Sequence, residues 1–187
     1  MIEYKKRIDI LKKLLLACVM TQVALLAHTG AGSVSGFSAG FAHPIGGTDH
    51  ILAMFAVGLW AFQMGGRAVW SVPLTFVVMM TIWAFLGLQG IHFPFIEEGI
   101  LLSVVVLGAM IVLGVKTPIM FSALLVGIFA IFHGTAHGAE MPLNVSHLEY
   151  AFGFVLATAL LHGSGIVTAM AIHKLTVLKT VCSTFQK

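Results

Sequence analysis

The sequence has very few charged side chains. Asp, Glu, Lys and Arg make up only 9% of its 187 residues, whereas 59% are hydrophobic. A soluble globular domain carries about 25% charged residues, so this composition excludes an ordinary water-soluble globule. Five cations and two acids lie within the first 13 residues, and the five cations beyond residue 28 are balanced by five acids. With no basic patch to hold a phosphate backbone, nucleic-acid binding is also excluded.

Cysteine is nearly absent, and its placement excludes two kinds of site. Cys18 and Cys182 lie at opposite ends of the chain, and neither belongs to a Cys-x-x-Cys pair, so we expect neither a disulfide framework nor a thiolate metal site. The sequence also lacks a Gly-x-x-x-x-Gly-Lys-Ser/Thr motif, which excludes ATP hydrolysis through a P-loop in this chain. Histidine, by contrast, occurs nine times. The chemistry is therefore expected at imidazoles.

Long apolar runs predict an all-α membrane protein. Residues 1–13 are polar and cationic, and the apolar run 14–27 is too short to span a bilayer but fits a secretory signal peptide. We expect this signal over residues 1–27 with cleavage near Ala27, the alternatives being cleavage after Ala31 or a retained N-terminus. Five longer stretches predict about five transmembrane helices in a single domain over residues 28–187. They are residues 45–63, 69–88, 99–115, 119–136 and 148–173.

The charges predict how these helices are oriented. If the mature N-terminus lies outside, Arg67, Lys116 and the C-terminal lysines all fall on the inner side, as the positive-inside rule requires. This arrangement predicts a bacterial inner-membrane protein with a periplasmic N-terminus and a cytoplasmic C-terminus. Most histidines then map to the outer side. They are His28, His43, His50, His92, His133, His137 and His147.

The first histidine motif is His43-Pro-Ile-Gly-Gly-Thr-Asp49-His50. If a helix begins at Pro44, His43 and His50 share one face to within about 20°. Asp49 would bind a metal ion directly or accept the imidazole N–H and fix the tautomer. The alternative is a structural hydrogen-bonded pair between helices, formed by Asp49 and His50.

The second motif is His133-Gly-Thr-Ala-His137-Gly-Ala-Glu140. Spacings of four and three residues place His133, His137 and Glu140 along one stripe of a helix. Two imidazoles one turn apart form a good metal clamp, and a carboxylate adds a hard third ligand. The alternative is a solvated, histidine-rich helix end.

The third group opens the last apolar stretch. His147 and Glu149 lie near the predicted outer surface, and His162 lies about 22 Å further along the helix axis. His162 is interpreted either as a core residue or as a relay ligand. The glycines at 163 and 165 leave open whether this long helix tilts, breaks or extends into the cytoplasm.

Together the three motifs, with His-Leu-Glu-Tyr-Ala-Phe-Gly-Phe at 147–154 as the third, resemble the HupE/UreJ family. The resemblance implies a permease, not an enzyme, that imports nickel or cobalt from periplasm to cytoplasm to supply hydrogenase or urease. It places His43, Asp49 and His50 in the signature metal motif and implies maturation machinery for nickel enzymes as downstream partners. The family usually has a sixth mature helix, whereas five stretches are recognised here.

The ligand chemistry adds its own expectations. Nitrogen and oxygen donors without thiolate suit Ni²⁺, Co²⁺ or Zn²⁺ as the transported ion, with no prosthetic group. A homo-oligomer in the bilayer stays open. The alternative function is an intramembrane zinc-dependent hydrolase that uses the same His/Asp/Glu cluster. A third is a haem-b electron carrier, with His50 paired to His133 or His147.

Overall fold

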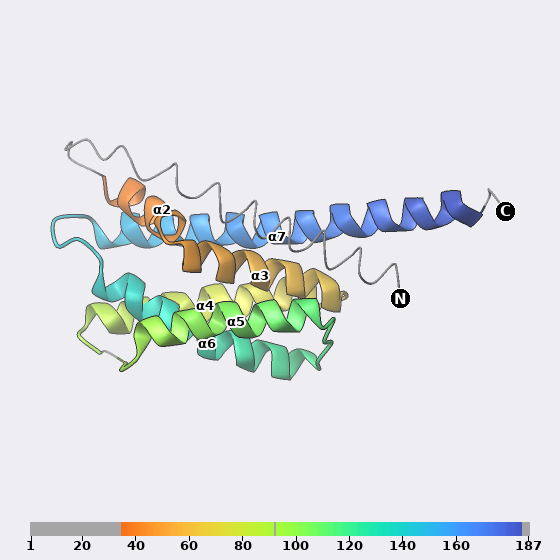
Figure 1. The fold of residues 1–187 in the computed structure, drawn as a ribbon. Coiled ribbons are helices and arrows are strands. Elements are labelled where there is room, and N and C mark those ends of the chain that lie inside the picture. Colours follow the sequence, from red (N-terminus) through yellow and green to blue (C-terminus); the bar gives the residue numbers. More distant parts are fainter. Residues whose placement is uncertain (1–34, 92, 185–187) are drawn as a thin grey trace. The chain divides into compact units, whose positions relative to one another are not determined.

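In a computed structural model of the chain, residues 35–91 and 93–184 are described, and all regular structure within them is helical (Figure 1). The expected signal peptide over residues 1–27 lies outside the described residues, as do His28 and His92. The all-α prediction is confirmed for the described part of the chain. Its helices are α2 (Gly36–Gly46), α3 (Thr48–Met64), α4 (Ala68–Leu88), α5 (Ile96–Val112), α6 (Ile119–Ala139) and α7 (His147–Thr184).

Three of these helices are long and apolar enough to cross a membrane: α4, α6 and, over residues 147–178, α7. Helices α2 and α3, which meet at an angle of 81°, make a fourth if the bent pair counts as one span. The sequence predicted about five spans. The difference arises because α3 and α5 have only 17 residues each, and each is about 26 Å long against a hydrocarbon core of about 30 Å.

The last apolar stretch forms one unbroken helix. Helix α7 runs for 38 residues without interruption at Gly163 or Gly165 and extends beyond the predicted end at residue 173. Gly165 serves close packing, because a Cβ there would collide with the carbonyl oxygen of Phe55 in α3. In return, a Cβ at Gly58 of α3 would collide with the carbonyl oxygen of His162. The two backbones therefore cross in direct contact.

Helices α4 and α6 also pack backbone to backbone. Every fourth residue of α4 from Ala68 to Ala84 is buried, which forms a continuous seam along one face. On α6, a Cβ at Gly134 would collide with the carbonyl oxygen of Met80, and one at Gly138 with that of Ala84. The hydrophobic effect does not drive helix association inside a bilayer. Close van der Waals packing of the backbones, which small residues allow, stabilises the crossing instead.

We expect Gly134→Val to destabilise the fold strongly. The added side chain would have to displace the backbone of α4 at Met80, which cannot rotate away as a side chain would. Overpacking typically costs about 1–3 kcal/mol, and a clash with backbone lies at the upper end of that range. The free energy of unfolding in mixed detergent micelles measures this cost. Gly163→Ala in α7 is the control, because its Cβ meets open space and should leave stability equal or slightly higher. Equal stability of both variants would contradict the close approach.

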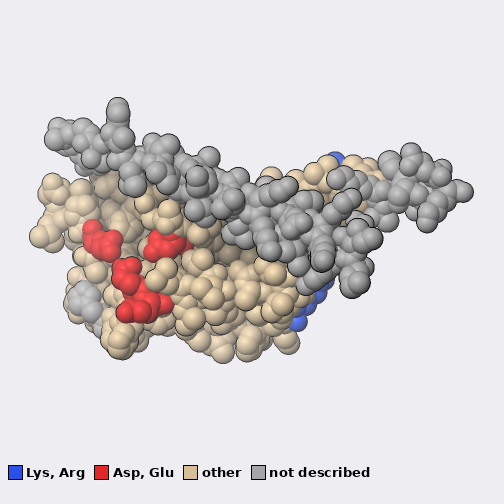
Figure 2. All heavy atoms as spheres, viewed as in Figure 1, with Lys and Arg blue, Asp and Glu red and all other residues tan. Residues whose placement is uncertain are grey.

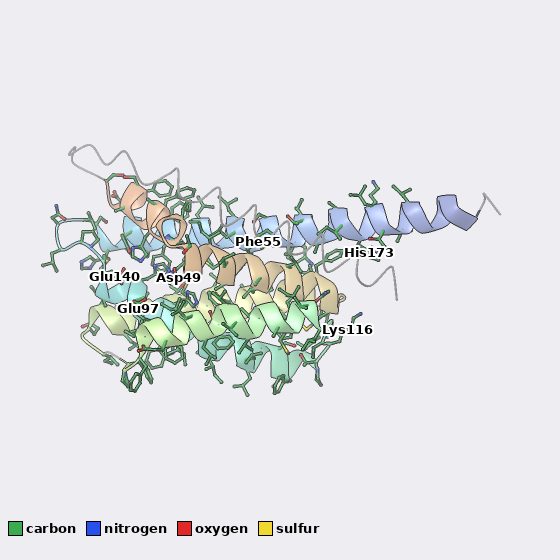
Figure 3. All side chains as sticks on the ribbon, in the orientation of Figure 1. Asp49, Phe55, Glu97, Lys116, Glu140 and His173 are labelled. Atoms are coloured by element: carbon green, nitrogen blue, oxygen red, sulfur yellow. The ribbon has the colours of Figure 1, made fainter. Side chains whose placement is uncertain are left out.

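The two ends of the helix bundle differ in charge. Consecutive helices from α3 to α7 run antiparallel (Figure 1), so the connections alternate between two ends. Acidic side chains gather at one end and the visible Lys and Arg side chains at the other (Figure 2). Asp49, Glu97 and Glu140 lie at the first end, whereas Lys116 and His173 lie toward the second (Figure 3). The charge separation expected from the sequence is present in the fold.

Candidate metal site

Four imidazoles from three helices meet at the acidic end of the bundle. His43 lies on α2, His50 on α3, and His133 and His137 on α6. The ring centroids are 4.7 Å apart for His43 and His137, 4.8 Å for His50 and His133, and 5.2 Å for His50 and His137. We call these four residues the histidine cluster. Two sequence motifs about 90 residues apart thus form one site.

A helix break positions the first two imidazoles. The prediction that a helix begins at Pro44 is wrong, because Pro44 lies within α2 and α3 begins only at Thr48. Gly47 between them is extended, with φ −100° and ψ 123°, and adjacent glycines favour such a break because they hold helical backbone poorly. His43 and His50 therefore do not share a helix face. The 81° bend brings their ring centroids to 6.0 Å instead.

Asp49 fixes the tautomer of His50. Its Oδ1 accepts a hydrogen bond from the backbone N–H of His50 at 2.8 Å and lies 3.1 Å from the Nδ1 atom of that ring. An ionised carboxylate only accepts, so Nδ1 carries the proton and Nε2 keeps its lone pair. That Nε2 atom is buried and has no partner among the described groups. Such an imidazole is prepared to bind a cation through Nε2.

Ser103 on α5 does the same for His133. The hydroxyl of Ser103 donates to the carbonyl of Ile100 at 2.6 Å, and its oxygen lies 3.1 Å from Nε2 of His133. Since the single hydroxyl proton is already used, Nε2 of His133 is the donor and Nδ1 keeps the lone pair. Nδ1 is buried and has no partner within residues 35–91 and 93–184. Sequence analysis missed Ser103, because a lone serine in an apolar stretch carries no signal.

His137 is buried against an aromatic ring. It stacks on Phe154 of α7 with centroids 4.9 Å apart and planes 6° from parallel. Among the residues that the structure describes, both of its ring nitrogens lack partners, as does the hydroxyl of Tyr150 beside the cluster. Leaving a buried polar atom unpaired costs about 1–3 kcal/mol. The cluster therefore holds four buried, unpaired imidazole nitrogens, and a bound ligand would offset the free-energy cost of burying them.

Two carboxylates, those of Asp49 and Glu140, flank the cluster at its exposed side. Glu140 follows the last residue of α6, and its Oε2 lies 3.3 Å from Nε2 of His43. The Glu140 side chain is 55% exposed and that of His43 is 21% exposed. Within the described ranges, no three His, Cys, Asp or Glu side chains are placed so that they could hold a metal ion as they stand. An ion held by three or more of these side chains would thus require some of them to rotate.

The remaining predicted residues lie outside the cluster. His147 and Glu149 are exposed in the first turn of α7, and Glu149 packs beside Gly36, where a Cβ would lie 3.1 Å from its Oε2. His162 is buried deeper on α7, with its ring 5.3 Å from Phe76 and perpendicular to it. The sequence grouped these three with the cluster as candidate ligands, and the fold does not bring them to it.

Comparison with known proteins places the chain in a family. A family model described as HupE / UreJ protein matches residues 15–185. Protein HupE from Rhizobium leguminosarum bv. viciae is 46% identical over 142 residues, which cover 75% of this chain and 74% of that protein. No solved structure matches significantly. The resemblance carried by the three histidine motifs is thereby confirmed, and the chain belongs to the HupE / UreJ protein family.

Proposed function

We propose that the chain is a permease that imports nickel or cobalt from the periplasm to the cytoplasm for metalloenzymes such as hydrogenase or urease. The observation that carries this proposal is the histidine cluster, in which buried imidazoles present free nitrogen lone pairs to one another. Ionisable residues inside a membrane segment are expensive and usually line a pathway. Membership in the HupE/UreJ family supports the nickel or cobalt assignment and transport over hydrolysis.

The donor set suits the proposed cargo. Neutral imidazole nitrogens with carboxylate oxygens bind borderline divalent ions such as Ni²⁺, Co²⁺ and Zn²⁺, and no thiolate is present to favour Cu(I). Glu140 and Asp49 lie at the accessible side, where negative charge raises the local concentration of cations. His43 is the first imidazole that an entering ion meets. His50, His133 and His137 then replace its water ligands.

The resting geometry supports transient binding. A transport site must bind its ion well enough for entry and weakly enough for release. The imidazoles of the cluster are in mutual contact but not arranged around one point. We propose that the ion binds when two or three rings rotate toward it, while Asp49 and Ser103 keep the correct nitrogens unprotonated.

We also propose an orientation in the membrane, which rests on the charge asymmetry of the fold. The acidic end with the histidine cluster faces the periplasm, and the end with Lys116 and the α3–α4 connection, which contains Arg67, faces the cytoplasm. In this arrangement the bent pair α2/α3 and the short helix α5 join α4, α6 and α7 as five spans of one domain over residues 28–187. A cleaved signal peptide over residues 1–27 sets the orientation of that domain.

The test of this function is uptake of ⁶³Ni²⁺ into proteoliposomes that contain the purified full chain. We expect saturable uptake well above that of empty liposomes. Excess Co²⁺ should reduce this uptake, whereas excess Mg²⁺ should leave it unchanged, because imidazole nitrogens do not displace water from the hydration shell of Mg²⁺. Absence of uptake together with one tightly bound Zn²⁺ per chain would contradict transport and favour the hydrolase.

A further inference from the structure

His162 is a deeply buried imidazole that the histidine cluster does not include. Its residue exposure is only 2%, and neither ring nitrogen has a partner in the described part of the chain. A neutral imidazole carries one donor and one acceptor, so both of its polar functions are left unmet in the interior. Leucine or phenylalanine would fill the same space without that cost. The residue therefore needs a reason beyond packing.

The depth of His162 separates it from the cluster. Its backbone meets α3 at Gly58, since a Cβ on Gly58 would collide with the His162 carbonyl oxygen. Gly58 lies eight residues after His50 on the same helix, which is about 12 Å along the axis. The cluster lies near the acidic end, and His162 lies well inside the bundle. His162 therefore lies deeper in the bundle than His50.

One aromatic ring contacts both the cluster and His162. Phe76 of α4 is fully buried, and its ring centroid is 5.4 Å from that of His133 and 5.3 Å from that of His162. His133 belongs to the cluster, so the inner edge of the cluster and His162 are neighbours of the same phenyl ring. An ion that leaves the cluster beside Phe76 toward the other end of the bundle would meet His162 next.

Two weak metal ligands, a hydroxyl oxygen and a thioether sulfur, lie one helical turn from His162 and Phe76. The Thr158 hydroxyl on α7 donates to the sulfur of Met80 on α4 at 3.8 Å, and both side chains are fully buried. Thr158 precedes His162 by four residues and Met80 follows Phe76 by four, so the two pairs occupy adjacent turns of packed helices. An imidazole with only weak additional ligands nearby is suited to bind a cation briefly and then release it.

We propose that His162 is a second, inner binding station for the transported divalent cation, next to the Phe76 ring that also contacts His133 of the histidine cluster. The proposal rests on the transport function proposed above. An ion that leaves the cluster would otherwise cross an apolar interior without a ligand, which is prohibitively costly. With His162 in place, the ion exchanges one imidazole for another beside the ring of Phe76.

Equilibrium dialysis of the purified full chain against ⁶³Ni²⁺ tests the station without requiring transport. We expect two classes of bound ion in the natural protein. His162→Ala should remove the weaker class and leave the stronger class, whose four imidazoles stay in place, with its affinity within about tenfold, because the two sites share only the neighbour Phe76. In proteoliposomes the same variant should take up nickel at least about tenfold more slowly.

Control variants separate binding from folding. His173→Ala removes an exposed imidazole from the same helix and should leave both classes of bound ion. His162→Leu fills the space left by the ring and should behave as His162→Ala does if it elutes as a folded monodisperse species. The station is wrong if the natural protein binds only one class or if His162→Leu keeps both. Loss of uptake in every protein, with two binding classes retained, would overturn the transport function and leave the station.

Discussion

His50→Ala is expected to lower nickel uptake to the level of empty liposomes. This substitution removes the imidazole that contacts both His133 and His137, so the cluster loses its central ligand. Asp49→Ala should reduce uptake by about 10- to 100-fold, the usual effect of losing the group that orients a metal-binding histidine. Without the carboxylate, the proton of His50 is free to move to Nε2, which then cannot bind an ion. Initial rates of ⁶³Ni²⁺ uptake into proteoliposomes measure both effects.

The matched control is His147→Ala. His147 is an exposed histidine at the same end of the bundle, and it lies outside the cluster, so its removal should leave the uptake rate within about twofold. Comparable thermal stability of all three variants is required for the comparison. Uptake that survives in folded His50→Ala at the natural rate would place the pathway away from the histidine cluster and refute the proposed entry site.

The helices themselves were largely predictable, because membrane spans are written as long apolar runs. The predicted stretch 119–136 became α6 over Ile119–Ala139, and 69–88 became α4 over Ala68–Leu88. The break at Gly47 was not predicted, since local sequence favoured one helix starting at Pro44. The adjacent glycines permit the break, and packing against α7 holds α2 in its bent position. Gly40 and Gly153 place α2 against α7, where a Cβ at either would collide with a carbonyl of the other helix.

The cluster was predictable only in part. Each motif indicated its own ligands by spacing, and His133 with His137 does lie on one buried stripe of α6. Spacing within a motif does not show which helices become neighbours, so the contact between the two motifs came from the fold. Spacing also could not show that His147 and Glu149, which lie at a helix start as His50 does, are exposed and outside the cluster. His162 was predicted as a candidate ligand, but its contact with Phe76 was not predicted.

Ser103→Ala is expected to weaken nickel binding and uptake by about 10- to 100-fold, although Ser103 never touches the ion in the proposed site. The hydroxyl accepts from Nε2 of His133 and so keeps Nδ1 unprotonated and directed into the cluster. Alanine leaves that N–H without a partner. The ring is then free to exchange tautomers, and its orientation is no longer held. Dialysis against ⁶³Ni²⁺ and uptake rates both report this loss.

Ser122→Ala is the matched control for the loss of a buried hydroxyl. Ser122 is fully buried on α6, but its hydroxyl bonds to Thr117 and to the sulfur of Met64 toward the opposite end of the bundle. Both substitutions remove one oxygen from the interior, so their effects on stability should be similar, whereas only Ser103→Ala should change nickel affinity. Ser103→Thr, which keeps the hydroxyl, should restore affinity if the larger side chain fits. Equal nickel affinity in Ser103→Ala and Ser122→Ala would show that the tautomer of His133 does not govern binding.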